Sequence, residues 1–517
     1  MNLSFFTMKN LYENALNKYS DKLALIFQNR KMTYGELRLA ANRFAHAIRK
    51  EGVQNNTGVA LLMPNCIEFV ISDIGIHLAG AVKVPLNAML SEKEIEYILK
   101  DSKAKIAVID EMFIETILRI KANLPDLGKV VVVGEMKETG EGFVHWEEFL
   151  QDSPDTNIPV QVSPNDRGLI AYTGGTTGLP KGVVHSQRNL VMNILSHQIE
   201  IELQEDERYL IMTPLTHGAG MVMQATLMKG AVHFIEKEFH PEIAVERIQK
   251  DKATITFMVP TMIYRILDYL SGKEFDGSSM RTIVYGAAPI AEERLKQGLE
   301  IFGPVFLQIY GQTEAPNFIT KFPREDHLKR KELLKSCGKP AYMVQVKIVD
   351  EFGKEVPPGV AGEIIAKTPY NMIEYLNNEE KTKETLKDGW LFTGDIGKKD
   401  EDGYIYLLDR KNDMIITGGM NVYSTEVENA LHLHPDIKGA AVIGIPDPDW
   451  GEAVAAVVIP REGSSIDENQ IIRYCKENLA KYKVPKKVYC INEFPLTPYG
   501  KIDKKQLRKQ FMAHAGS

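Results

Sequence analysis

The chain has few cysteines, and none of them stands in a disulfide or zinc-binding pattern. Four cysteines occur among 517 residues, at Cys66, Cys337, Cys475 and Cys490, with no Cys-x-x-Cys pair and no His-Cys cluster. Disulfides belong mainly to secreted proteins, and zinc sites require closely spaced ligands, so this scatter argues against both. We expect four buried thiols in a reducing compartment.

Long apolar runs and an excess of positive charge are also absent. The most apolar region, residues 59–86, is interrupted by Glu68, Asp73 and Lys83, which leaves no uncharged span of 18 residues for a membrane helix. The first ten residues lack the charged head and apolar stretch of a signal peptide. The net charge of −7 argues against nucleic acid as the main partner. These absences predict a cytoplasmic protein without an integral membrane segment. Both a monomer and a homodimer are compatible with the sequence.

What the chain does contain is typical of a globular protein with more than one domain. Hydrophobic residues make up 44% and charged residues 25% of a chain that is too long for one ordinary domain. Over the first 330 residues, short β-branched runs alternate with segments of helical periodicity, which predicts an α/β fold with parallel-rich sheets covered by helices. The expected strands are 59–63, 105–109, 130–133, 255–259, 282–285 and 305–310, and the expected helices are 37–49, 92–99, 241–250 and 292–301.

The sequence changes character from about Met343. Short strands joined by tight turns at 350–353 and 400–403 predict a small β subdomain. A polar cluster, 409–413, then stands between two further strands, and a final segment of strands and helices follows. The expected division is a large N-terminal domain over 1–408, a hinge at 409–413 and a smaller α+β C-terminal domain over 414–517.

The most informative segment is rich in glycine and threonine. Residues 172–182 have the sequence Tyr-Thr-Gly-Gly-Thr-Thr-Gly-Leu-Pro-Lys-Gly. Glycines let the backbone turn tightly and present N–H groups, and the threonine hydroxyls and the Lys181 ammonium add to an anion site suited to nucleotide phosphates. A Walker loop has Gly directly before its Lys and runs into a helix, whereas Lys181 follows Pro180 and a strand is expected at 183–185, before a helix opens near Ser186. The alternative is a glycine turn without a ligand.

Two further segments follow expected strands. Residues 308–314, Gln-Ile-Tyr-Gly-Gln-Thr-Glu, offer Tyr310 as a flat surface for adenine and Glu314 as a carboxylate for Mg²⁺, which prefers one or two carboxylates beside phosphates. In residues 285–289, Tyr-Gly-Ala-Ala-Pro, small residues allow a flat ring to approach the backbone. Taken alone, each segment is equally compatible with an ordinary turn.

Two charged residues nearer the C-terminus are compatible with nucleotide chemistry but do not by themselves indicate it. Asp395 can accept both hydroxyls of a ribose, although an Asp in a loop is usually solvated. Lys501, after Gly500, offers a positive charge on a long, flexible side chain. Lys501 also belongs to a basic run with Lys504 and Lys505, and such runs are usually solvated faces.

Together these motifs resemble the adenylate-forming superfamily, which includes acyl-CoA and aryl-CoA synthetases, the adenylation domains of nonribosomal peptide synthetases and beetle luciferases. The resemblance extends from Thr33-Tyr34-Gly35-Glu36-Leu37 to Lys501. It implies ATP and Mg²⁺ as cofactors and coenzyme A as a substrate. It also implies that the C-terminal domain is mobile, rotates about Asn412 and carries Lys501 to and from the reacting atoms.

The resemblance assigns a role to each motif residue. The implied nucleotide contacts are Thr173, Gly174, Gly175, Thr176, Thr177, Gly178, Lys181, Gly286, Ala287, Ala288, Pro289, Gln308, Tyr310, Gly311, Thr313, Asp395 and Arg410. The implied catalytic residues are Lys501, Thr173, Glu314 and His217, with Glu314 as the metal ligand. The implied acyl pocket contains His217, Tyr285, Gly286 and Gly311, and the implied coenzyme A contacts are Gly418, Gly419 and Trp450.

The segment 212–220 matches the gate of the acyl pocket in this superfamily. Relatives that activate amino acids have an aspartate here to hold the ammonium group, and none lies between Thr213 and Met223. The nearby methionines, Met221, Met223 and Met228, suit an adaptable apolar tunnel, although they fit a core helix equally well. His217 is compatible with a structural role as well as with the gate.

The expected function is therefore that of an ATP-dependent acid–CoA ligase, with a fatty acid favoured over an aromatic one. Acid and ATP would form an acyl-adenylate and diphosphate, and the thiol of coenzyme A would then displace AMP. The alternatives are an aryl-acid ligase, an enzyme that loads the phosphopantetheine of a carrier protein, and a non-catalytic nucleotide-binding protein. The last alternative does not explain the combination of Lys181, Glu314, Asp395, Arg410 and Lys501.

Overall fold

The computed structural model describes residues 6–136, 140–173, 180–411, 413–497 and 502–512. The described chain forms two compact units. The first comprises the residues up to Thr173 together with 180–346 and Ala366–Leu391, and the second comprises Lys347–Ile365 and 392–512. The second unit thus includes two segments that the sequence division assigned to the N-terminal domain. The boundary at 409–413 stays a prediction.

An eight-stranded sheet lies in the first unit. Its strands are β3 (Gly58–Leu62), β4 (Val82–Leu86), β5 (Ile106–Asp110), β6 (Lys129–Val133), β7 (Phe143–His145), β8 (Arg167–Thr173), β9 (Lys181–Ser186) and β19 (Glu374–Tyr375). Their order is β19-β9-β8-β4-β3-β5-β6-β7, and every pair from β8 to β7 in this order is parallel. Only β9 and β19, at one edge, add antiparallel pairs.

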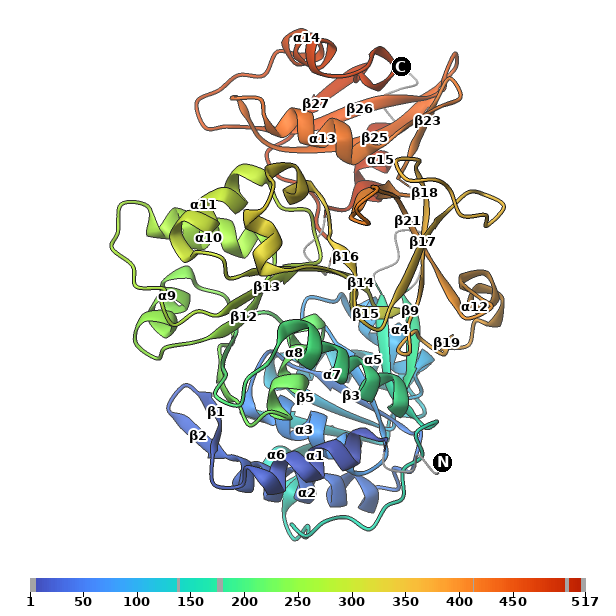
Figure 1. The fold of residues 1–517 in the computed structure, drawn as a ribbon. Coiled ribbons are helices and arrows are strands. Elements are labelled where there is room, and N and C mark those ends of the chain that lie inside the picture. Colours follow the sequence, from blue (N-terminus) through green and yellow to red (C-terminus); the bar gives the residue numbers. More distant parts are fainter. Residues whose placement is uncertain (1–5, 137–139, 174–179, 412, 498–501, 513–517) are drawn as a thin grey trace. The chain divides into compact units, whose positions relative to one another are not determined.

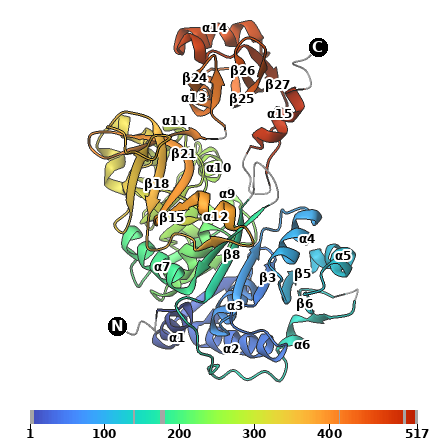
Figure 2. The same cartoon turned by 90° about the vertical axis from the view of Figure 1, so that its right-hand side faces the viewer.

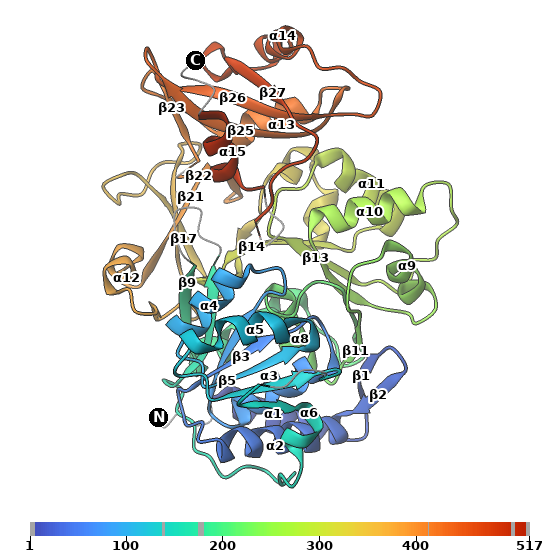
Figure 3. The same ribbon diagram turned by 180° about the vertical axis from the view of Figure 1, so that it is seen from behind.

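Helices cover both faces of this sheet. They are α2 (Tyr34–Lys50), α3 (Ile67–Leu78), α4 (Glu92–Asp101), α5 (Ile114–Ile120) and α6 (Trp146–Leu150). Right-handed crossovers require α3 to lie on the face opposite α4 and α5, and Figures 2 and 3 show this arrangement. The sequence determines where α2 and α4 begin, because Thr33 with Glu36 and Ser91 with Glu94 form capping boxes.

A nine-stranded sheet completes the core of the first unit. Its strands are β1 (Leu23–Phe27), β2 (Arg30–Thr33), β10 (Arg208–Ile211), β11 (Val232–Ile235), β12 (Ile255–Met258), β13 (Thr282–Gly286), β14 (Phe306–Gln312), β15 (Ala315–Phe322) and β16 (Lys339–Pro340). Their order is β16-β15-β14-β13-β12-β10-β11-β1-β2, parallel from β14 to β1. Its outer helices, α9 (Pro241–Gln249), α10 (Pro260–Leu270) and α11 (Glu292–Phe302), lie together in Figure 1.

Three more helices, α1 (Met8–Lys18), α7 (Gln187–Ile201) and α8 (Gly218–Leu227), pack among the helices of the first unit. A buried polar network joins α8 to α3. Gln224 on α8 donates to the carboxylate of Asp73 on α3, and Lys83 Nζ lies 2.9 Å from the same carboxylate. Since a buried charge is tolerated only when it is paired, this network helps to fix α8 against the first sheet.

The third sheet contains the points at which the chain passes between the units. Its strands are β17 (Gln345–Val349), β18 (Gly362–Lys367), β20 (Leu386–Lys387), β21 (Trp390–Lys399) and β22 (Ile405–Arg410). The helix α12 (Glu379–Thr385) comes directly before β20 in the sequence. Both expected turns are confirmed, because Gly353 N donates to Asp350 O and Gly403 N to Asp400 O. One prediction is wrong: Asp409 and Arg410 do not lie in a loop but continue β22, where they pair with Ile396 and Asp395.

The C-terminal sheet of the second unit has helices on both faces. Its strands are β23 (Ile415–Thr417), β24 (Met420–Val422), β25 (Ile437–Asp447), β26 (Gly451–Pro460) and β27 (Lys487–Cys490). Alternate residues of β25 and β26 pack against α13 (Ser424–His432) and α14 (Glu468–Asn478) on one face and against α15 (Lys504–Met512) on the other. This period of two is the ordinary pattern of a strand buried on both faces.

The α/β class and the α+β character of the C-terminal part are confirmed. All six expected strands and all four expected helices of the first 330 residues are present within three residues of their predicted ends. The expectation of four buried thiols is right for Cys66, Cys337 and Cys475 and wrong for Cys490, which is exposed at the end of β27. No helix within the described ranges is both long and apolar enough to span a membrane.

Five histidines of the first unit are buried, and burial lowers the pKa of each imidazole to about 4. They are His77, His185, His197, His233 and His327. In the unfolded chain each would take up a proton near its ordinary pKa of about 6.5. The unfolded state therefore binds more protons between about pH 6.5 and 4, and acid favours unfolding in this window.

We expect the free energy of unfolding to fall as the pH drops through this window, as measured by melting curves between about pH 7.5 and 4.5. His77→Leu should flatten the dependence, because neither ring nitrogen of His77 has a hydrogen-bond partner among the described residues. The control is His240→Leu, at an exposed position. Equal pH slopes for the two variants would contradict the prediction.

Candidate active site

The glycine-threonine segment connects two antiparallel strands. Thr173 at the end of β8 pairs with Lys181 at the start of β9. Ser186 then caps α7, accepting from the backbone N–H of Asn189. The strand expected after Lys181 is thereby confirmed, and the strand-to-helix arrangement of a Walker loop is excluded. The predicted contacts Gly174, Gly175, Thr176, Thr177 and Gly178 lie outside the described residues.

A tyrosine connects the cation and the carboxylate that the sequence analysis singled out. The short strand β19 pairs with β9 and places the ring of Tyr375 4.7 Å from Lys181 Nζ. The Tyr375 hydroxyl donates to Glu314 Oε1 at 2.6 Å. Burial, and then the neighbouring Glu314 carboxylate, raise the pKa of this phenol, so it stays a hydrogen-bond donor. The structure thus gathers Lys181 and Glu314 around one aromatic side chain.

Two further hydrogen bonds hold the turn at 312–315 against β9 and β19. His185 on β9 is hydrogen-bonded through Nε2 to the carbonyl of Thr313 at 2.8 Å, and Met372 N donates to the carbonyl of Glu314 at 2.7 Å. The Glu314 side chain is buried, and no described residue is bonded to its Oε2. A carboxylate oxygen that has no partner among the described residues fits a Mg²⁺ ion whose other ligands are phosphates and water.

The segment at the end of β13 combines a glycine that packs against β14 with an unusual backbone angle, and its role in binding a ring stays a prediction. A Cβ at Gly286 would lie 2.5 Å from the carbonyl oxygen of Ile309, so only glycine fits between β13 and β14. Ala287 has a φ of 67°, which is sparsely populated by residues with a side chain and marks local strain. Ala287, Ala288 and Pro289 are exposed.

The aromatic residues of these two strands are buried. Tyr310 is 8% exposed on β14. Tyr285 is fully buried, and its hydroxyl is hydrogen-bonded to Gln308 at 3.1 Å and to His327 at 3.0 Å. The Tyr285 hydroxyl is therefore hydrogen-bonded within the protein, and the part of Tyr285 in an acyl pocket stays a prediction.

His217, the predicted gate residue, lies at the N-terminus of α8 and is exposed. Its Nε2 is 3.2 Å from the amide nitrogen of Asn87. A second asparagine, Asn317 on β15, donates to the carbonyl of Gly218 at 3.2 Å. The backbone of Asn317 lies so close to Gly311 that a Cβ there would be 2.6 Å from Asn317 N. Asn317 thus joins two predicted acyl-pocket segments, those of His217 and Gly311.

In the second unit, the two residues predicted to contact ribose form an ion pair. Arg410 Nε lies 2.8 Å from Asp395 Oδ1, across the paired strands β21 and β22. Asp395 is buried, whereas the side chain of Arg410 is 53% exposed. The cross-strand register thus holds a carboxylate in place beside an accessible guanidinium.

The three residues predicted to contact coenzyme A lie together. Gly418 N donates to the carbonyl of Trp450, and a Cβ at Gly418 would be 2.5 Å from the indole ring. Gly418 and Gly419 both have positive φ, which glycine adopts without strain. Trp450 is 49% exposed, and the ammonium of Lys486 lies 4.3 Å from its ring centroid. The result is an exposed indole with a cation on its face.

Three other lysines lie close to Lys486 in the sequence. Lys483 is paired with Glu426 at 2.6 Å, with only 17% of its side chain exposed, and Lys481 and Lys487 are exposed.

The predicted hinge residue Asn412 and the predicted catalytic Lys501 lie outside the described residues. Side chains on either side of them are fixed. Asp409 accepts from the backbone N–H and the hydroxyl of Ser424, and that hydroxyl accepts from Lys504 at 2.6 Å. Asp413 is paired with Arg508 on α15 at 2.9 Å.

Sequence reasoning missed Tyr375 and Asn317. Tyr375 lies about sixty residues beyond Glu314, on a strand of two residues that has no periodicity to detect. Asn317 lies three positions after Glu314, but nothing in the sequence indicates that its side chain turns back to Gly218. The only available signal was its closeness to the Tyr-Gly-Gln-Thr-Glu motif.

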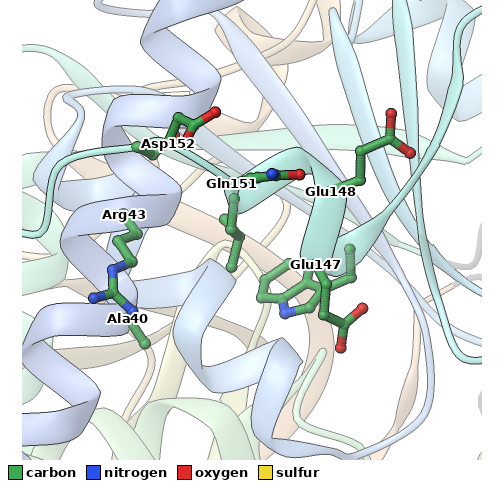
Figure 4. A pocket seen from close by; sticks show the side chains of 9 residues that line it. Ala40, Arg43, Glu147, Glu148, Gln151 and Asp152 are labelled. Carbon is green, nitrogen blue, oxygen red and sulfur yellow. The ribbon is translucent and has the colours of Figure 1, made fainter.

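A surface groove of about 700 Å³ between α2 and α6 is a separate feature of the first unit. Figure 4 shows Arg43 and Glu148 on its rim. Arg43 is already paired with Asp155 at 2.9 Å. The groove contains none of the predicted site residues, so it is not the candidate site.

Comparison with known proteins gives a consistent result for both parts of the chain. Residues 12–376 match the AMP-binding enzyme family, and residues 426–501 match the AMP-binding enzyme C-terminal domain. A feruloyl-CoA synthase from Amycolatopsis is 36% identical over 93% of this chain and 94% of its own length. The medium/long-chain-fatty-acid–CoA ligase FadD8 of Mycobacterium tuberculosis is 33% identical over 98% of this chain and 90% of its own length.

Solved structures agree with these matches. The crystal structure of the anthranilate CoA ligase AuaEII in complex with anthranoyl-AMP has a TM-score of 0.89 and 29% identity, and the match covers 99% of this chain and 98% of that one.

We predict that Tyr375→Phe raises the Mg²⁺ concentration for half-maximal diphosphate release by roughly tenfold or more, since partners that orient a metal ligand affect metal affinity by about 10–100-fold. The ring that faces Lys181 is retained. The control is Tyr370→Phe, which removes a buried hydroxyl bonded to the Phe318 carbonyl. An unchanged midpoint in Tyr375→Phe, or equal shifts in both variants, would rule out an orienting role.

Proposed function

Because the chain belongs to the AMP-binding enzyme family and is an AMP-forming acid–thiol ligase, we propose that it joins a hydrophobic carboxylic acid to coenzyme A at the expense of ATP. The acid would be fatty or aromatic. The relatives act on both kinds, a feruloyl-CoA synthase and a fatty-acid–CoA ligase among them.

The observation that carries this proposal is the cluster of Lys181, Tyr375 and Glu314. One phenol presents its face to an ammonium at 4.7 Å and its hydroxyl to a carboxylate at 2.6 Å. An ammonium beside the glycine-threonine segment suits the phosphates of ATP. A carboxylate held by one oxygen suits the Mg²⁺ that accompanies them.

Glu314 would hold Mg²⁺ through Oε2, and the ion, when bound, neutralises charge on the phosphate chain. Among the described residues, no group of three or more His, Cys, Asp or Glu side chains is placed to hold a metal ion. Glu314 would therefore act as a single protein ligand, as is usual for Mg²⁺ bound together with a nucleotide.

Two other sets of residues would hold the nucleoside. The exposed 287–289 segment would give the adenine ring access to backbone, and Asp395 would accept the ribose hydroxyls while Arg410 holds that carboxylate in place. These contacts would position the α-phosphorus and take no direct part in the bonds that form and break there. Their contribution to the rate is the orientation of the reactants.

The reaction would proceed in two displacements. A carboxylate oxygen of the acid forms a bond to the α-phosphorus, the bond to the bridging oxygen breaks, and diphosphate leaves. The sulfur of coenzyme A then bonds to the acyl carbon, its proton is lost to solvent, and AMP leaves. In the first step, Lys501 would stabilise the negative charge that develops where two anions meet. Gly418, Gly419 and Trp450 would serve the second step.

The apolar character of the acid follows from the surroundings of the gate. No carboxylate lies between Thr213 and Met223 to hold an ammonium group. Phe257 lies beside Gly218, where a Cβ would be 3.3 Å from its ring. Met223 is fully buried in α8 and belongs to the core, so it does not favour a fatty chain over an aromatic ring.

We expect the purified protein to release diphosphate from MgATP only when a hydrophobic acid is present, and to form a thioester only when coenzyme A is added. A panel of fatty and aromatic acids, with coenzyme A, phosphopantetheinyl carrier protein or an amine as acceptor, measures both steps. Lys501→Ala should lose diphosphate release but still consume supplied acyl-adenylate. Absence of diphosphate release with every acid would refute the function.

We also expect Trp450→Ala to raise the KM for coenzyme A by roughly tenfold, because stacking of a base on an aromatic ring contributes about 1–3 kcal/mol. The KM for ATP and the rate of diphosphate release should not change. Trp390→Ala is the matched control, since Trp390 also lies under a lysine, Lys367, in another sheet. Equal coenzyme A KM values for the two variants would remove Trp450 from the site.

A further inference from the structure

Asn317 is held in a strained conformation beside the gate segment. It lies on β15 with a φ of 64°, which asparagine tolerates better than most residues. Its amide nitrogen donates to His197 Nε2 at 2.8 Å and to the carbonyl of Gly218 at 3.2 Å. A costly backbone conformation kept by two side-chain hydrogen bonds indicates that the position of this amide matters.

The orientation of the amide follows from its neighbours. His197 Nδ1 lies 2.8 Å from the carbonyl of Asn193, so Nδ1 carries the proton and Nε2 is left as an acceptor. Burial lowers the pKa of His197 to about 4, which keeps the ring neutral in this tautomer at neutral pH. With acceptors at His197 and Gly218, the nitrogen must face both, and the oxygen must point the other way.

The oxygen of Asn317 has no donor among the described residues. It would lie 2.7 Å from a Cβ at Gly218, and the Phe257 ring would lie 3.3 Å from the same point. An acceptor therefore lies next to an apolar ring and a bare glycine backbone. On its other side, the backbone of Asn317 is in contact with Gly311.

We propose that Asn317 is a specificity-determining residue, whose Oδ1 accepts a hydrogen bond from an O–H or N–H group on the acyl part of the acid. This inference rests on the proposed function and narrows its substrate class. The preferred acid is hydrophobic but has one hydrogen-bond donor, such as a hydroxyl or an amino group. Phe257 would contact the apolar part of such an acid, and the absence of a side chain at Gly218 lets the Asn317 oxygen lie beside that ring.

The consequence is a difference between acids rather than a general gain in rate. An acid without the donor would bury the Asn317 oxygen without a partner, and a buried polar group without a partner costs binding energy. A site built to bond a substrate hydroxyl rejects the analogue that lacks it more strongly than an apolar pocket rejects an added hydroxyl. We expect about a tenfold preference in kcat/KM for the acid that bears the donor.

The experiment compares matched acids on the full-length protein. The pairs are 4-hydroxycinnamate with cinnamate, 2-aminobenzoate with benzoate, and 12-hydroxydodecanoate with dodecanoate, and the readout is kcat/KM for ATP-dependent diphosphate release. Asn317→Gly removes the acceptor and is compatible with the positive φ. We consider the pair in which the wild type prefers the acid with the donor most strongly. For this pair, kcat/KM for the acid with the donor divided by kcat/KM for the acid without it should fall from about ten in the wild type to about one in Asn317→Gly.

Asn193→Ala is the matched control, because the Asn193 side chain is buried in the same region and donates to the Pro316 carbonyl. It should change kcat/KM for both members of a pair by the same factor. Two results overturn this inference alone: a kcat/KM ratio of about one for every pair in the wild type, or a kcat/KM ratio that is unchanged in Asn317→Gly. Absence of diphosphate release with every acid overturns the proposed function, and the inference with it.

Discussion

The arrangement of the candidate site depends on one phenol that serves two opposite charges. The Tyr375 ring faces the Lys181 ammonium, and its hydroxyl bonds to the buried Glu314 carboxylate. The three residues come from β9, the turn after β14 and the short strand β19, which are far apart in the sequence. The face of a tyrosine ring attracts an ammonium, and the hydroxyl at its edge donates to a carboxylate. One side chain can therefore contact both charges and keep them apart. The hydrogen bond from His185 to the Thr313 carbonyl keeps the same turn against β9.

Most of the first unit could be predicted because its signals are local. Alternating runs predicted the strands, and the helix start predicted near Ser186 agrees with its bond to the nearby backbone of Asn189. Thr33 and Ser91 cap α2 and α4 in the same local way. Asp409 and Arg410 were misplaced because their polar side chains suggested a loop, whereas strand pairing with Ile396 and Asp395 decided their conformation. Tyr375 and Asn317 could not be found, since their partners are determined by tertiary packing. The motif residues of the candidate site were chosen by resemblance, and those outside the described ranges stay predictions.

The predicted nucleotide site and the surroundings of Gly218 differ in how the sequence builds them. The nucleotide motifs are contiguous in sequence, so they are recognisable in any member of the family. The surroundings of Gly218 instead combine a ring from β12, a helix terminus and an amide from β15. If these elements select the acid, as we propose, a change in any one of them would alter which acid fits and leave Lys181, Glu314 and Tyr375 in place. Family membership is therefore easier to establish than the identity of the acid.

The bonds between Asp409 and Ser424 have a mechanical consequence. They join the two sides of residue 412, while Asp413 and Arg508 are both on its far side. If the C-terminal segment turns about residue 412, Asp409 must lose both hydrogen bonds from Ser424 and accept from water instead. The Asp413–Arg508 ion pair stays intact, because both residues move together. The Arg410 carbonyl, which accepts from the backbone N–H groups of Asp413 and Met414, also crosses residue 412. The Asp409 carboxylate would thus be one of the restraints on turning, and weakening it would change how long each orientation of the segment lasts.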